Sequence, residues 1–164
     1  MDLRVEPVRR EWVVALSQGD AEFTERFGVP VERGWAVFPE TLPFLLAASE
    51  DDEPDPWGPH LFFGPDGTLV GNGGWKGAPV DGEAELGYAV APAVRGRGLA
   101  TAAVGLLLAR AQGRGVRRVV AHTLAEESAS TAVLRRCGFT KVSELVDPED
   151  GAEWRWEVDL VSRA

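Results

Sequence analysis

The sequence of 164 residues predicts an α+β fold with a mixed central sheet and helices on both of its faces. Three patterns predict this class. Strand-like segments that turn back on themselves come before residue 91, a helical period covers Leu99–Arg110, and a second pair of strands ends the chain. A strand, a helix and a strand in this order form a right-handed crossover between parallel neighbours. The sheet is therefore expected to be antiparallel in its N-terminal half, with one crossover and a C-terminal hairpin.

The N-terminal third is expected to be helical. Trp12 and Leu16 lie four residues apart on one helix face, and Phe23 and Phe27 have the same spacing in a second segment. A third, short helix is expected over Thr41–Ala48. Because too few residues precede residue 49 to build an independent core, these helices should belong to the same domain as the rest of the chain.

An acidic loop and a run of strands follow. Residues 49–56 carry two prolines and several charges, which exclude regular structure. Strands over His60–Phe63 and Thr68–Trp75 flank a Gly-Pro-Asp-Gly turn and form a hairpin, and the strand Glu83–Val90 pairs with it. Alternation along this third strand divides its side chains between two faces: Leu86, Tyr88 and Val90 on one, and Glu85, Gly87 and Ala89 on the other.

The C-terminal half contains the crossover and the final hairpin. The helix from Leu99 is expected to stop at Gly113 and Gly115, and a strand follows at Val116–Thr123. The remaining elements are a helix over Ser128–Cys137, closed by Gly138, and strands over Gly138–Val146 and Ala152–Leu160. One domain of average size is the default at this length, so we expect residues 1–164 to form a single domain.

Composition excludes several classes of protein. Cys137 is the only cysteine, which rules out an internal disulfide, and the two histidines, His60 and His122, argue against a metal site made by the protein. The N-terminus mixes charges of both signs, and no apolar run approaches the ~18–20 residues of a membrane span, so we expect a cytoplasmic protein with no membrane contact. The formal net charge of −9 argues against binding to nucleic acid.

Charge is unevenly distributed along the chain. Residues 1–92 hold 6 basic and 17 acidic side chains, whereas no acidic residue occurs between Ala93 and Ala125. That window holds six arginines: Arg95, Arg97, Arg110, Arg114, Arg117 and Arg118. It indicates a local anion site, although for the segment 110–118 a solvated basic face is the favoured interpretation.

The segment Arg95-Gly96-Arg97-Gly98-Leu99-Ala100 lies between a strand and the start of an apolar helix. Its glycines allow the backbone amides to turn toward one point, and the first amides of a helix have no acceptor within the helix. Such a turn binds phosphate, and flanking arginines reinforce it. The chain contains neither a nucleotide-triphosphate loop ending in Gly-Lys-Ser/Thr nor a Gly-x-Gly-x-x-Gly motif.

The block Glu85–Ala100 resembles the acetyl-CoA-binding motif of the GCN5-related N-acetyltransferase (GNAT) family, Arg/Gln-x-x-Gly-x-Gly/Ala. Arg95, Gly98 and Ala100 fill that pattern. The run Ala121–Phe139 is similar to the same family, especially to its ribosomal-protein acetyltransferase-like branch. Two motifs in the family's order and spacing are far more specific than either motif alone.

The resemblance implies acetyl-CoA as co-substrate and no metal. The residues that it implies for binding coenzyme A are Ala89, Val90, Ala91, Arg95, Gly96, Arg97, Gly98, Leu99, Ala100, Glu127 and Ser130. The amides of the glycine turn would hold the pyrophosphate, and the strand ending in Ala91 would pair its open edge with pantetheine. A backbone amide near Ala89 or Val90 would stabilise the oxyanion that forms when an amine attacks the thioester.

Glu85 occupies the position at which some family members keep a glutamate base. A base poised near neutrality would need partial burial to raise the pKa of Glu85, and a solvated carboxylate is the equally weighted alternative. His122 is interpreted as a core histidine. The chain departs from the family pattern at Glu127, where Asn is frequent, and at Leu134, where many members have the Tyr that protonates the thiolate. The general acid therefore stays open.

The resemblance implies an acyl-CoA-dependent N-acyltransferase that moves an acetyl group to a primary amine by direct attack in a ternary complex. A CoA-binding or sensor module without catalysis is the alternative that the missing Tyr keeps open. The acceptor is expected to be an amine-bearing small molecule or the amine of a peptide or protein. A homodimer is compatible with the resemblance.

Overall fold

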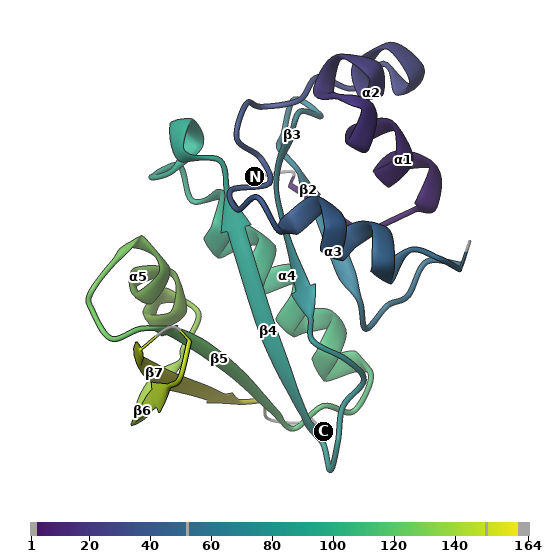
Figure 1. Cartoon of the computed structure of the whole chain (residues 1–164). Helices are drawn as coiled ribbons and strands as arrows, with labels where there is room; N and C mark the ends of the chain where they lie inside the picture. Colours follow the sequence, from purple (N-terminus) through teal and green to yellow (C-terminus); the bar gives the residue numbers. More distant parts are fainter. Residues whose placement is uncertain (1–2, 52, 150, 161–164) are drawn as a thin grey trace.

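The computed structural model describes residues 3–51, 53–149 and 151–160. Its elements follow the chain in the order β1 (Arg4–Pro7), α1 (Arg10–Gln18), α2 (Asp20–Phe27), α3 (Thr41–Ala48), β2 (Pro59–Phe63), β3 (Leu69–Trp75), β4 (Glu83–Val90), η1 (Pro92–Val94), α4 (Leu99–Gly113), β5 (Arg118–Leu124), α5 (Ala129–Arg136), β6 (Thr140–Asp147) and β7 (Gly151–Asp159). The strands form one seven-stranded sheet in the order β1-β2-β3-β4-β5-β7-β6 (Figure 1).

The predicted fold class is confirmed. β4 and β5 run parallel and are joined through α4, and the other neighbouring pairs of the sheet are antiparallel. Helix α3 and strand β4 have the predicted bounds, whereas α4 continues through Gly113 and the chain turns at Gly115, whose φ is 83°. Asp52 of the expected loop and Asp150 of the expected turn lie outside the described residues, as do residues 1–2 and 161–164.

Sequence reasoning did not find β1. This strand has only four residues and ends in Pro7, so it is too short to show an alternating pattern. It pairs antiparallel with β2, from Arg4 opposite Phe63 to Pro7 opposite His60, and forms an edge of the sheet. A proline, which has no amide hydrogen to donate, is tolerated there because an edge strand pairs with a neighbour on one side only.

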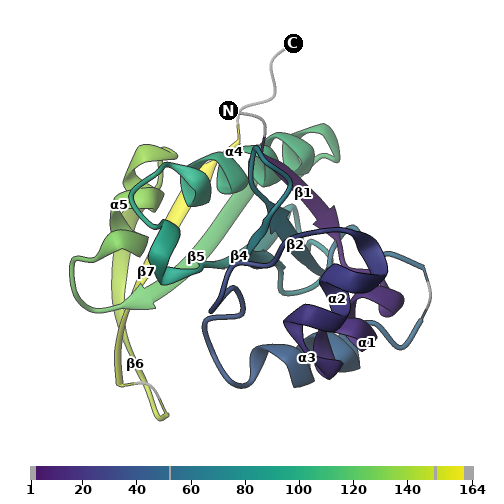
Figure 2. The same cartoon turned by 90° about the horizontal axis from the view of Figure 1, so that it is seen from above.

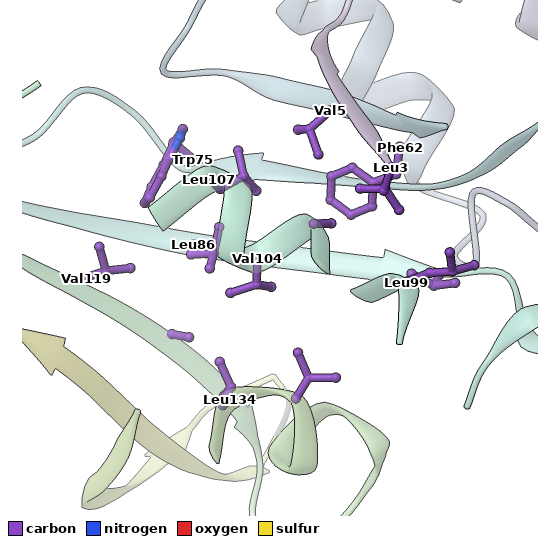
Figure 3. Packing of buried hydrophobic residues seen from close by; sticks show 14 of the residues in the cluster. Leu3, Val5, Phe62, Trp75, Leu86, Leu99, Val104, Leu107, Val119 and Leu134 are labelled. Atoms are coloured by element: carbon purple, nitrogen blue, oxygen red, sulfur yellow. The ribbon is translucent and has the colours of Figure 1, made fainter. Parts of the chain in front are cut away.

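Helices cover both faces of the sheet. α4 and α5 pack on one face, where Phe62, Leu86 and Leu107 belong to the larger cluster of buried side chains (Figure 3). α1, α2 and α3 pack on the other face against Leu61 and Phe63. Figure 2 shows that these three helices lie on the side of β2 and β3, away from β5, β7 and β6. Within the described residues, no helix is long and apolar enough to cross a membrane.

Strands β4 and β5 separate part of the way along their length. Their pairing runs from Glu83 opposite Arg118 to Leu86 opposite Ala121 and then stops. β4 continues to Val90, still paired with β3 along its other edge. Figure 1 shows the two strands diverging toward the ends near η1 and α5. Residues 87–90 therefore have a backbone edge that no described strand covers.

His60 is a buried histidine on β2. Its side chain is only 1% exposed, and Nδ1 lies 2.9 Å from the carbonyl oxygen of Gly58. Burial lowers the pKa of His60 from 6.5 to about 4, with the charges of Arg110 and Arg114 acting in the same direction. The imidazole is therefore neutral in the folded protein near pH 7 and donates from Nδ1 to the carbonyl.

This burial predicts a loss of stability in mild acid. The unfolded chain takes up a proton at His60 near pH 6.5 and the folded chain only near pH 4, so the free energy of unfolding should fall across that window, by up to about 3 kcal/mol from this group. His60→Asn keeps a donor for Gly58 but does not titrate. The free energy of unfolding, measured with urea between pH 4 and 7, should depend less on pH for this variant than for the wild type. The same pH dependence in both proteins would assign the effect to other groups.

Candidate active site

The glycine turn ends β4 and starts α4. The amide of Ala91 bonds to the carbonyl of Val70 at 2.8 Å, and η1 then redirects the chain. Gly96 and Gly98 have φ of 81° and 78°, the left-handed region in which other residues pay a steric cost. Among the described residues, none accepts a hydrogen bond from the amides of 96–100. Free donors thus gather at the N-terminus of a 15-residue helix, where anions bind.

A groove connects this turn with the free edge of β4. One cavity of about 240 Å³ lies between the glycine turn, the first turn of α4 and one side of α5. A second, also about 240 Å³, continues along β4 toward Tyr88 and is bounded by the N-terminal part of α5. The two cavities share five lining residues: Val90, Arg95, Ala100, Ala129 and Val133.

Three polar residues line the first cavity: Thr101, Arg95 and Arg136. The hydroxyl of Thr101 is buried and has no hydrogen-bond partner in the described part of the chain. Arg95 donates from Nε to the carbonyl of Val90 at 3.3 Å, and Arg136 reaches the same cavity from α5. Within the described ranges no carboxylate pairs with either arginine. A buried hydroxyl, free amides and two unpaired cations suit a phosphate-bearing ligand.

The structure places most of the predicted coenzyme-binding residues along this groove. They are Ala89, Val90, Arg95, Gly96, Gly98, Leu99, Ala100 and Ser130. Arg97 instead lines a cavity on the other side of the turn, together with Glu32 and Asp66. Arg117 and Arg118 of the acid-free window bind Asp81 and Asp159, far along the sheet at the start of β5.

Three residues near the groove already have partners within the protein, through the backbone or the side chain. Ala91 is fully buried and its amide is used by the sheet. The carboxylate of Glu127 accepts from Thr131 Oγ1 at 2.9 Å and pairs with Arg135 at 2.6 Å. Leu134 is 0% exposed and packs in the core, so this position of α5 does not face the groove.

Tyr88 joins β4 to α5 across the opening between the strands. Its hydroxyl donates to the carbonyl oxygen of Ser130 at 2.8 Å. Burial raises the pKa of Tyr88 well above its usual range, so the phenol stays protonated. This contact positions the N-terminal part of α5, which supplies Ala129 and Ser130 to the groove.

Sequence reasoning missed a contribution from the loop between α2 and α3. Val37 and Phe38 line the second cavity, and Phe38 is 55% exposed. The amide of Phe38 bonds to the carbonyl of Ala36 at 2.8 Å around Val37, whose φ is 69°, which is the strained form of a three-residue turn. Asn72 of β3 holds this turn by donating to the carbonyls of Trp35 and Ala36. The feature that distinguishes this turn is the positive φ of Val37, a β-branched residue, and a sequence does not show backbone angles.

A charged cluster lies on the sheet face that α4 and α5 do not cover. Oε2 of Glu85 is 2.9 Å from Nζ of Lys76 and 3.1 Å from Nδ1 of His122. Half-burial raises the pKa of Glu85, but the hydrogen bonds and charges of Lys76 and His122 outweigh it and hold the pKa below its ordinary value. The raised pKa that a base poised near neutrality would need is therefore not found at Glu85. The sequence did not show that Lys76, directly after β3, and His122 of β5 each bring a donor to the carboxylate.

No group of three or more His, Cys, Asp or Glu side chains in the described ranges is arranged to hold a metal ion.

Removing the Lys76 ammonium should raise the pKa of Glu85. Lys76→Met keeps much of the side-chain volume and leaves the burial of the carboxylate in place, so the cause that raises the pKa remains while the largest opposing charge is lost. A carbon-13 NMR titration of the Glu85 carboxyl measures the change. Lys141→Met is the matched control, because Lys141 is the other lysine and pairs with Glu144 instead. An unchanged Glu85 pKa in Lys76→Met would show that the ion pair is absent in solution.

Comparison with known proteins agrees with this geometry. Residues 3–140 match the family model described as "Acetyltransferase (GNAT) domain". Among solved structures, the chain resembles RimL, a ribosomal L7/L12 alpha-N-protein acetyltransferase in complex with coenzyme A, with 18% identity, a TM-score of 0.71 and coverage of 98% of this chain and 96% of that one.

Two further structures have the same fold. The ribosomal-protein-S5-alanine acetyltransferase from Vibrio fischeri is 16% identical, with a TM-score of 0.70 and coverage of 98% and 94%. A chimera of the spermidine N-acetyltransferase of Vibrio cholerae is 14% identical, with a TM-score of 0.68 and coverage of 98% and 96%. No curated protein sequence matches the chain. Since the family model extends over most of the sequence and the fold agrees with it, this chain belongs to the GNAT family of acetyltransferases.

Proposed function

We propose that the protein transfers the acetyl group of acetyl-CoA directly to a primary amine while both substrates are bound. The observation that carries the proposal is the groove that runs from the free amides of the glycine turn to the uncovered edge of β4. One end is suited to a pyrophosphate and the other to an extended amide chain that pairs with a strand edge.

The glycine turn is assigned to the pyrophosphate of coenzyme A. The amides of Gly96, Arg97, Gly98, Leu99 and Ala100 are free to donate, and Thr101 Oγ1 is an orphaned donor beside them. The guanidinium groups of Arg95 and Arg136 add positive charge from two sides of the cavity. Arg97 contributes through its amide, because its side chain lines another cavity.

The free edge of β4 is assigned to pantetheine. Ala89 and Val90 offer backbone groups there, and Ser130 and Val133 form the opposite wall. Ala91 closes this edge, and Glu127 contributes through its backbone, because its carboxylate is held by Thr131 and Arg135. Acetyl-CoA supplies the activated acyl carbon, and an amide of Ala89 or Val90 stabilises the charge that develops on the acyl oxygen.

The acceptor approaches from the face that carries Glu85. α1, α2 and α3 cover only the β1–β3 side of this face, and the described helices leave β5 and β7 open (Figure 2). Glu85 takes part in removing the proton of the amine, which is a nucleophile only in its neutral form. The acidic N-terminal half favours the approach of a cationic amine, either a small molecule or a peptide or protein amine.

Named relatives support an amine acceptor without selecting one. Two structures with this fold are named for ribosomal proteins and one for spermidine. A cytoplasmic location, the lack of nucleic-acid and membrane partners, and homodimerisation stay predictions from the sequence.

A CoA-binding module without catalysis is the second candidate. Leu134 is buried in the core at the position where many family members keep a general acid, which favours this alternative. Release of CoA in the presence of a panel of amines and peptides distinguishes the two candidates, because a sensor binds the coenzyme without turning it over.

Acetyl-CoA should stabilise the folded protein, and the glycine turn should be necessary for this effect. Ligand at a hundred times its Kd adds about 2.7 kcal/mol to the free energy of unfolding. Gly98→Glu places a carboxylate and a Cβ where the pyrophosphate is assigned, so calorimetric binding and the Tm shift should be lost. Gly105→Glu is the control, because Gly105 lies exposed on α4 with open space around it. Wild-type affinity in Gly98→Glu would place the phosphate elsewhere.

Glu85→Gln should slow turnover without affecting the coenzyme. The amide keeps the shape of the side chain but removes its charge, so kcat should fall by about 10²–10⁴-fold, the usual contribution of acid–base catalysis. Calorimetry should give an unchanged Kd for CoA. Glu144→Gln is the matched control, since Glu144 also pairs with a lysine but lies on β6. A kcat within a few-fold of wild type would remove Glu85 from proton transfer.

A further inference from the structure

We propose that His122, through Nε2, is the group that accepts the proton from the acceptor amine, and that Glu85 is a positioning residue that orients its imidazole. This inference rests on the proposed acetyltransferase function and names the proton acceptor at that site. It replaces a single carboxylate base by a carboxylate–imidazole pair contributed by two parallel strands.

The position of His122 in the sheet is the first support. β4 and β5 pair as far as Leu86 and Ala121, so His122 is the first residue of β5 beyond the last pair. Ala121 belongs to the core under α4, and the alternation of a strand turns His122 to the opposite face, where Glu85 lies. The imidazole is therefore at the fork where the uncovered edge of β4 begins.

The contact with Glu85 defines which nitrogen carries the proton. Nδ1 of His122 lies 3.1 Å from Oε2 of Glu85, and Nζ of Lys76 approaches the same oxygen at 2.9 Å. A carboxylate paired with an ammonium group is ionised and can only accept, so Nδ1 must donate. The lone pair of the neutral imidazole is then on Nε2. Among the described residues none forms a hydrogen bond or ion pair with that nitrogen, and the side chain is 21% exposed.

Glu85 is poorly suited to accept the proton itself. Lys76 and His122 both donate to one of its oxygens, and the pKa of the carboxyl lies below its ordinary value. An imidazole has an ordinary pKa near 6.5 and is closer to the pH of a neutral cell than any carboxylate. Once protonated, His122 would face an ionised carboxylate at 3.1 Å, which stabilises the imidazolium.

Charged groups from three strands face His122. Glu85 of β4 favours its protonation, whereas Lys76 beside β4 and Arg155, which is directly opposite His122 on β7, oppose it. Arg155 is held by Glu83 at 2.6 Å and by Glu157 at 3.0 Å. Glu153 lies two residues from Arg155 on the same face of β7 and opposite Leu124 of β5. Charges of both signs thus surround the imidazole.

The proton balance of the step follows from these roles. The acceptor arrives as an ammonium ion and loses one proton, which passes through Nε2 to solvent. The nitrogen lone pair forms the C–N bond to the thioester carbon, and the C–S bond breaks with its electron pair going to sulfur. The second proton on nitrogen moves to Nε2 and then to the CoA thiolate, so the products are an amide and CoA-SH.

Imidazole NMR tests the pair without any turnover. In nitrogen-15-labelled protein above pH 8, His122 should show the signals of an Nδ1–H tautomer. Glu85→Gln, which removes the charge that selects this tautomer, should shift the population toward Nε2–H. A His122 that is in the Nε2–H form in the wild-type protein would overturn the proposal.

Kinetics then test the catalytic role, after the wild-type chain has been shown to bind acetyl-CoA and to release CoA with an amine. His122→Asn keeps a donor toward Glu85 but has no group at Nε2, so kcat should fall about 10²–10⁴-fold with an unchanged Kd for CoA. The acidic limb of the pH profile should disappear in His122→Asn and persist in the residual activity of Glu85→Gln. His60→Asn, at the other histidine, should keep wild-type kcat at pH 7.5.

The possible results distinguish a failure of the proposed role of His122 from a failure of the proposed acetyltransferase function. A limb that persists in His122→Asn and vanishes in Glu85→Gln would make Glu85 the base and overturn this proposal alone. Wild-type protein that does not bind acetyl-CoA, or binds it without turnover with amines, would overturn the proposed function instead. The tautomer measurement is independent of both results.

Discussion

The early end of the pairing between β4 and β5 is the constraint on which the groove and the charged cluster depend. Each strand is held by its other neighbour where the two diverge: β4 pairs with β3 from Leu86 to Val90, and β5 pairs with β7 from Arg118 to Leu124. Because only the first residues of the two strands pair with each other, they can diverge without losing their positions. The edge between residues 87 and 90 therefore stays uncovered in a rigid frame, and a ligand need not break the sheet to reach it.

Elements on either side of this opening turn their polar groups toward it. The glycine turn directs free amides into the groove, and Thr101 adds a buried hydroxyl without a partner. A buried polar group left unsatisfied costs about 1–3 kcal/mol, so its position is explained best by a ligand that completes its hydrogen bonding. The positive φ of Val37 across the groove is a second local cost at the same place, and Asn72 maintains it.

The two ends of the opening differ in charge, which matches the two partners of the proposed reaction. Arg95 and Arg136 make the end at the glycine turn positive, as phosphate requires. At the other end Glu85 is ionised between Lys76 and His122. The sheet brings these three side chains together. Lys76 follows β3 directly, Glu85 is on β4 and His122 is on β5, and these three strands are neighbours in the sheet.

The sequence by itself determined the fold class, the approximate positions of most elements and the glycine turn, because each depends on local signals. Periodicity marked α4 and β4, and Gly96 and Gly98 marked a turn that only glycine adopts at low cost. Tertiary structure alone decided the direction of the pKa shift of Glu85, the contact between His122 and Glu85, and the contribution of Val37 and Phe38 to the groove. A carboxylate's pKa depends on which donors the fold brings within 3 Å, and strand pairing between distant residues leaves no trace in local periodicity. For the same reason a histidine interpreted as part of the core proved to be half-buried beside an ionised carboxylate at the fork of the sheet.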